Sequence, residues 1–155
     1  FNDMASKYDS AEATEYWENI LNYRFIMTFR VEGFSVPKLE ERLTDLMQQN
    51  IFKPYVIILD GLKFDESGRG LLVELKELAK KYSMRIWFTI HTHRHEPPTD
   101  DGLPLSFRHV EDLFDVLVQL VAEGPEVYIK VLKGRSSEAK QDALLLDPAT
   151  MLIKV

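Results

Sequence analysis

The sequence predicts an α/β fold: three layers, with a mostly parallel sheet, helices on both of its faces and an antiparallel extension at the C-terminal end. Apolar runs of strand length alternate with amphipathic helical segments over the first part of the chain. The run Pro54–Asp60 carries four consecutive apolar residues without polar alternation, which is typical of a strand covered on both faces. From Leu113 onward the pattern changes to short strands joined by turns, which indicates hairpins.

Composition limits the class of protein. A length of 155 residues predicts one domain, and a hydrophobic content of 45% is enough for a globular core. The net charge of −6 gives no general reason to bind nucleic acid or an anionic membrane. The chain has no cysteine, which excludes disulfides and thiolate metal sites. No apolar run approaches the roughly 20 residues of a membrane span, so we expect a cytoplasmic protein without a membrane partner.

The first residues suggest that the printed sequence is a fragment. It starts at Phe1, in a segment that does not resemble a natural start. We expect a single domain over residues 1–155 that lacks its N-terminal part. A processed natural N-terminus is the alternative.

The N-terminal part predicts a helix, a strand and a second helix. Asp9 or Ser10 can cap a helix that ends at Leu21, because either side chain accepts from free amides of the first turn. Tyr23–Arg30 is rich in aromatic and β-branched residues and predicts a strand. A second helix is expected from Ser35 to near Asn50, with a proline in its first turn.

The middle of the chain predicts two strands separated by a helix. The strand Pro54–Asp60 precedes a helix at Gly68–Tyr82, whose leucines repeat at helical spacing. Arg85–Ile90 is the next strand, and it leads into a polar cluster. The stretch Pro97–Leu105, rich in proline and aspartate, predicts a loop.

The C-terminal part predicts antiparallel strands. They are expected at Leu113–Val121, at Glu126–Lys133, and at Ala143–Leu146 and Met151–Val155 around the turn 147–150. Their short spacing favours hairpins over crossover helices.

Asp60 is the first candidate for a chemical role. Ligands of open α/β sheets bind beyond the carboxyl ends of the parallel strands, and Asp60 stands at such an end. A carboxylate after a buried strand is costly unless it meets water, a cation or a hydrogen-bond donor. In nucleotide hydrolases such an aspartate holds Mg²⁺, usually through water. Alternatively, Asp60 only caps the turn that follows.

Two further groups complete a pattern. The next strand ends in a polar tip at His91 and Thr92, and Lys133 and Arg135 stand at the end of the alternating strand Val127–Leu132. With Asp60, this order resembles the C-terminal half of a RecA-like P-loop ATPase core of the KaiC/DnaB branch. The resemblance implies that Asp60 holds Mg²⁺ and that His91 or Thr92 senses the terminal phosphate. Lys133 and Arg135 would then act on the phosphate bound by a neighbouring subunit.

The resemblance also implies ATP and Mg²⁺ as cofactors, and a homo-oligomer, for which a hexamer is one form. The chain departs from the family because no G-x-x-x-x-G-K-[ST] motif occurs in it. We therefore expect no hydrolysis without an upstream phosphate-binding loop. Glu32 lies at a strand end, but one strand too late to match the family's catalytic glutamate.

Two other functions stay open. His91, His93 and His95 alternate, so an extended backbone would place three imidazoles on one side, as in a metal-dependent hydrolase. Ligands so close in sequence rarely all reach one ion, and Arg94 adds unfavourable charge. The other possibility is a nucleotide-free module for interaction or assembly.

Overall fold

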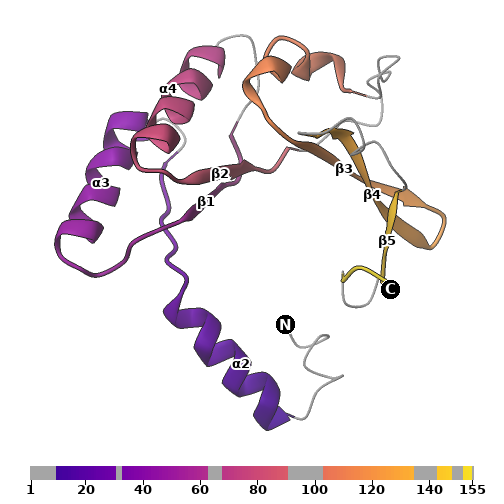
Figure 1. Ribbon diagram of the computed structural model, residues 1–155, viewed down its shortest axis with the longest axis horizontal. Coiled ribbons are helices and arrows are strands. Elements are labelled where there is room, and N and C mark those ends of the chain that lie inside the picture. Colours follow the sequence, from indigo (N-terminus) through magenta and orange to yellow (C-terminus); the bar gives the residue numbers. More distant parts are fainter. Residues whose placement is uncertain are drawn as a thin grey trace. The chain divides into compact units, whose positions relative to one another are not determined.

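A computed structural model describes residues 10–30, 33–62, 68–90, 103–134, 143–147 and 152–154. The chain forms two compact units, one of Thr28–Phe114 and one of Phe1–Met27 with Asp115–Val155. The first holds a small parallel sheet with helices and the second a separate antiparallel sheet (Figure 1). The predicted α/β class is therefore confirmed at this level.

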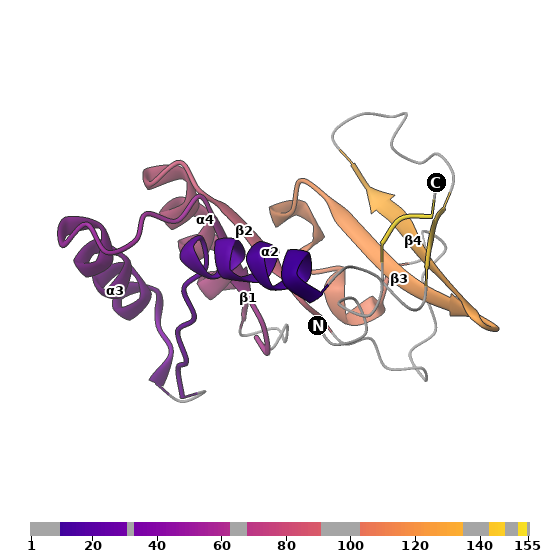
Figure 2. The ribbon, with the colours of Figure 1, turned by 90° about the horizontal axis from the view of Figure 1, so that it is seen from below.

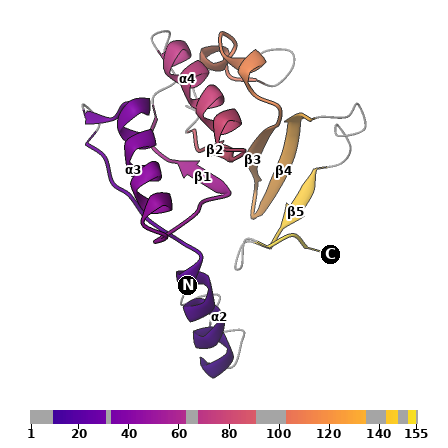
Figure 3. The same cartoon turned by 60° about the vertical axis from the view of Figure 1, so that its left-hand side comes forward.

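Two helices form the main packing layer of the unit Thr28–Phe114. They are α3, Val36–Gln48, and α4, Gly68–Lys81, and they lie side by side (Figure 3). Ser35 has the extended backbone of an N-cap residue, and a proline follows in the first turn, as expected. Their apolar stripes supply much of the core, which includes Val36, Leu39, Leu43, Leu72, Leu75 and Leu78.

Each helix is followed, two residues after its end, by a residue with left-handed backbone. These residues are Asn50 at φ 54° and Ser83 at φ 53°. The next amide donates to a carbonyl five residues earlier: Ile51 N to Leu46 O at 2.9 Å, and Met84 N to Ala79 O at 2.8 Å. This pattern closes the last turn of each helix and redirects the chain toward the following strand.

The parallel sheet consists, in the described residues, of β1, Val56–Leu59, and β2, Arg85–Phe88. The strands run parallel with Val56 opposite Arg85 and Leu59 opposite Phe88. The connection between them contains α4, which packs against β2. Both strands are shorter than predicted, but their order around one helix agrees with the sequence.

The prediction that this strand is covered on both faces is wrong for the described residues. Alternate side chains of the sheet are exposed: Val56 is 47%, Ile58 69% and Trp87 48% accessible. Ile57 and Leu59, which point the other way, are only partly exposed. The apolar run predicted two covering layers, but it cannot specify which segment forms the second layer.

The antiparallel sheet has the strand order β3–β4–β5. The strands β3, Leu117–Glu123, and β4, Glu126–Lys133, form a hairpin with Gly124 at φ 63° in its turn (Figure 2). β5, Leu144–Leu146, pairs antiparallel with β4. An isolated bridge joins Leu146 to Ile153, so the predicted antiparallel hairpins are confirmed.

The remaining elements show where local pattern was sufficient and where it was not. The predicted N-terminal helix is present as α2, Ser10–Asn22. The predicted strand Tyr23–Arg30 is wrong, because the structure gives these residues no strand partner. The start of the predicted strand Leu113–Val121 is also wrong, since Glu111–Leu113 forms a 3₁₀ turn. Across the described ranges, no helix is long and apolar enough to cross a membrane.

Candidate functional site

Asp60 lies at the carboxyl end of β1, directly after the last paired residue. Its neighbour on the adjacent strand is Thr89, which follows β2 in the same way, since Leu59 pairs with Phe88. The Thr89 amide donates to the Leu59 carbonyl at 3.1 Å, so the two chains stay together one step beyond the strands. The parallel register therefore places a carboxylate and a hydroxyl at one edge of the sheet.

The two side chains are in contact. The Thr89 hydroxyl donates a hydrogen bond to Oδ1 of Asp60, and both residues are exposed. Gly61 follows at φ 79°, and, its chain neighbours apart, no heavy atom of the described residues lies within 4 Å of the position that a Cβ there would take. An exposed carboxylate with one oxygen oriented by a hydroxyl suits the outer coordination of a hydrated cation.

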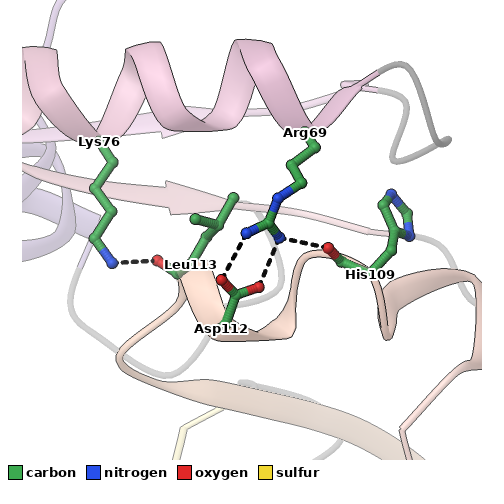
Figure 4. Close-up of polar contacts among 5 residues, drawn as sticks. All are labelled: Arg69, Lys76, His109, Asp112 and Leu113. Atoms are coloured by element: carbon green, nitrogen blue, oxygen red, sulfur yellow. Dashed lines mark hydrogen bonds and ion pairs between the residues drawn. The ribbon is translucent and has the colours of Figure 1, made fainter.

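A polar clamp joins the start of α4 to the segment that precedes the antiparallel sheet (Figure 4). Arg69 donates to both carboxylate oxygens of Asp112 at 2.7 Å, and to the His109 carbonyl at 2.5 Å. Two turns along α4, Lys76 donates to the Leu113 carbonyl at 2.9 Å. The hydrogen bond with Asp112 raises the pKa of Arg69, as expected for a charge-assisted bidentate contact.

Aromatic packing connects the segment that precedes β3 to β2. The rings of Phe88 and Phe114 meet edge to face with centroids 5.5 Å apart, and Phe107 lies 5.0 Å from Phe114. Phe107 is 4% exposed and Val110 is fully buried. Because Phe88 immediately precedes Thr89, this packing anchors the strand end that carries the hydroxyl.

Among the predicted site residues other than Asp60, the structure describes Lys133 alone. Lys133 ends β4, where it is half-buried and opposite Leu117, and it belongs to the other compact unit. Several predicted residues lie outside the described ranges: Glu32, His91, Thr92, His93, His95 and Arg135. Their roles remain predictions.

Thr89 is the residue that sequence reasoning missed. The strand was predicted to run to Ile90, so its polar tip was sought at His91. The structure ends β2 at Phe88, two residues earlier. Aligning the two strand ends, with Thr89 in the place that Asp60 takes after β1, would have found it.

Within the described ranges, Asp60 is not part of a cluster of potential metal ligands. No group of three or more histidine, aspartate or glutamate side chains is placed there to hold an ion. The three alternating histidines fall outside that part, so the metal-dependent hydrolase stays an untested alternative.

Comparison of the chain with protein-family models, curated proteins and solved structures finds no match.

Proposed function

We propose that this chain is part of a RecA-like ATPase core of KaiC/DnaB type and carries its Mg²⁺-holding aspartate. The supporting observation is the position of Asp60. It stands exposed at the carboxyl end of β1, beside the end of a parallel strand. Open α/β sheets bind their ligands beyond this edge, because the loops there leave room for one. In the proposed complete core, further strands and helices make the sheet part of three layers.

The bound cation would supply positive charge that offsets the charge on the terminal phosphates of ATP. Asp60 fits this cation because the residue is exposed and the Thr89 hydroxyl donates to one of its carboxylate oxygens. Asp60 would hold the cation through a water molecule, since Mg²⁺ keeps most of its hydration shell.

The remaining roles follow from the resemblance and are part of the proposal. His91 or Thr92 would contact the terminal phosphate. Lys133 and Arg135 would act on the phosphate held by a neighbouring copy in a homo-oligomer. The phosphate-binding loop would come from residues outside the printed sequence, because none of the 155 residues forms that motif.

The test is Asp60→Asn in the complete protein, including any residues that precede Phe1. Loss of the metal-holding charge removes several kcal/mol of transition-state stabilisation, so Mg²⁺-dependent ATP hydrolysis should fall about 100-fold or more. Steady-state ATPase assays over a range of Mg²⁺ concentrations measure this.

Asp45→Asn is the matched control, because Asp45 is also exposed but lies on α3. It should leave hydrolysis unchanged. Equal activity of Asp60→Asn and the wild type would contradict the proposed function, and absence of ATP binding would favour the interaction module.

A further inference from the structure

We infer that Thr89 is a positioning residue, whose hydroxyl holds the Asp60 carboxylate in the orientation that a hydrated divalent cation requires. This inference rests on the proposed function and adds to it a residue that the resemblance did not indicate. The resemblance placed the polar tip at His91 or Thr92, two or three residues further along.

The backbone fixes the distance between the two groups. The parallel register continues past Leu59 and Phe88, and the Thr89 amide donates to the Leu59 carbonyl at 3.1 Å. Thr89 and Asp60 are therefore directly opposite each other on adjacent strand ends. A side chain two residues further along would alternate to the same face but extend beyond the carboxylate.

The side chain fixes the orientation. A threonine hydroxyl has one proton to donate, and here the Asp60 Oδ1 accepts it. The β-branched side chain is stiff about χ1, so the hydroxyl direction is well defined. With one acceptor site of Oδ1 occupied, the other sites of the carboxylate could accept from water molecules of the metal. Hydrogen bonds of this kind to a metal-holding carboxylate set its direction and its basicity.

Aromatic packing holds the strand end that carries Thr89 in place. The Phe88 ring packs against Phe114, 5.5 Å between centroids. Phe114 directly follows Leu113, whose carbonyl accepts from Lys76 of α4. A positioning residue needs such rigid support, because a mobile hydroxyl would not restrict the carboxylate.

The experiment compares Thr89→Val and Thr89→Ser in the complete protein. Valine keeps the branched shape but removes the hydroxyl, whereas serine keeps the hydroxyl. Loss of an orienting hydrogen bond of this kind weakens metal affinity about 10- to 100-fold. We expect Thr89→Val to raise the Kd for Mg²⁺ by this factor, measured by isothermal titration calorimetry in the presence of ADP. The Mg²⁺ concentration for half-maximal ATP hydrolysis should rise in parallel. The KM for ATP at saturating Mg²⁺ should change little, and serine should restore most of the Mg²⁺ affinity.

Thr44→Val is the control, since Thr44 also pairs through its hydroxyl, with the Tyr82 hydroxyl at 3.3 Å, but lies on α3. It should not change the Mg²⁺ dependence. Thermal unfolding by circular dichroism verifies that each variant is folded.

The outcomes separate the two claims. Full activity of Asp60→Asn would overturn the proposed function together with this inference. An inactive Asp60→Asn with a normal Mg²⁺ dependence in Thr89→Val would overturn only the positioning role. A serine variant as impaired as the valine variant would also overturn it, because the hydroxyl would then not be the cause.

Discussion

Glu40 on α3 accepts hydrogen bonds from Lys81, the last residue of α4, and from Tyr82, which follows it. Lys81 Nζ lies 2.6 Å and the Tyr82 hydroxyl 2.9 Å from its Oε1. The hydrogen bond from Lys81, together with that from Tyr82, lowers the pKa of Glu40 below its ordinary 4.5. The same contact with Glu40 raises the pKa of Lys81 above 10.5. The ion pair thus ties the two helices together at one end.

Replacing Glu40 by glutamine should destabilise the protein modestly at pH 7. Because the pKa of Glu40 is lower in the folded state, its contribution is complete above its unfolded pKa of about 4.5. That contribution is lost as the pH falls through the folded pKa. The difference between variant and wild type should therefore narrow between pH 5 and pH 3, as measured by urea unfolding midpoints.

Glu41→Gln is the control, because Glu41 is the exposed neighbour on the same helix. It should show a smaller difference at pH 7. A difference for Glu40→Gln that stays constant or widens on acidification would contradict the assigned ion pair. The contribution is modest because exposed ion pairs are screened by solvent.

At the residue scale, the sequence predicted Asp60 but not its partner. Asp60 ends an apolar run, and this local signal is sufficient to identify it. Thr89 has no comparable signal, because threonine is common in strands. Its importance comes from the register with β1, which depends on how residues 29 apart in sequence pair.

At the element scale, the two helix ends differ in how well their residue suits the backbone. Ser83 follows the end of α4 at φ 53°, and Asn50 follows the end of α3 at φ 54°. Left-handed backbone costs roughly 1–2 kcal/mol for most residues, and asparagine tolerates it better than serine. The end of α4 is therefore the less favourable of the two.

Ser83→Gly should stabilise the protein by roughly 0.5–1 kcal/mol, because glycine avoids the left-handed cost but loses more chain entropy on folding. Chemical denaturation gives this difference. Asn50→Gly serves as the comparison and should bring a smaller gain. A loss of stability in Ser83→Gly would show that the serine makes a compensating contact.

The helices were predictable because their hydrogen bonds are local. The predicted ranges agree with α2, α3 and α4 to within one or two residues. The strand predicted at Tyr23–Arg30 was wrong, although its composition is typical of strands. A strand forms only where a second strand offers its edge, and composition carries no information on that partner.

At the scale of the whole molecule, the division of strands between sheets was beyond prediction. The sequence predicted one mostly parallel sheet with an antiparallel extension. The described residues instead form two sheets, β1–β2 and β3–β4–β5. Turn residues such as Gly124 specify which strands are joined by hairpins, but pairing across long connections depends on packing of the whole chain.

The exposed apolar face of β1–β2 should make the 155-residue chain self-associate at high concentration. Ile58 is 69% exposed, beside Val56 and Trp87. Exposed apolar side chains on neighbouring strand positions, such as the paired Ile58 and Trp87, favour association. Removing one large apolar side chain from such a contact costs about 1.5 kcal/mol, or about tenfold in Kd. Ile58→Thr should weaken association by that factor in sedimentation equilibrium.

Ile51→Thr is the control for this prediction. Ile51 is 58% exposed but lies outside the sheet, after α3. It should leave association unchanged. Equal association of Ile58→Thr and the wild type would contradict a role for this face.

The parallel pairing of β1 and β2 also affects the order in which the chain folds. A hairpin such as β3–β4, with a tight turn, closes within about 1–10 μs. Asp60 and Thr89 are 29 residues apart with α4 between them, so their strands meet only after that long connection has closed. The Asp60–Thr89 contact is therefore expected to form later in folding than the β3–β4 hairpin.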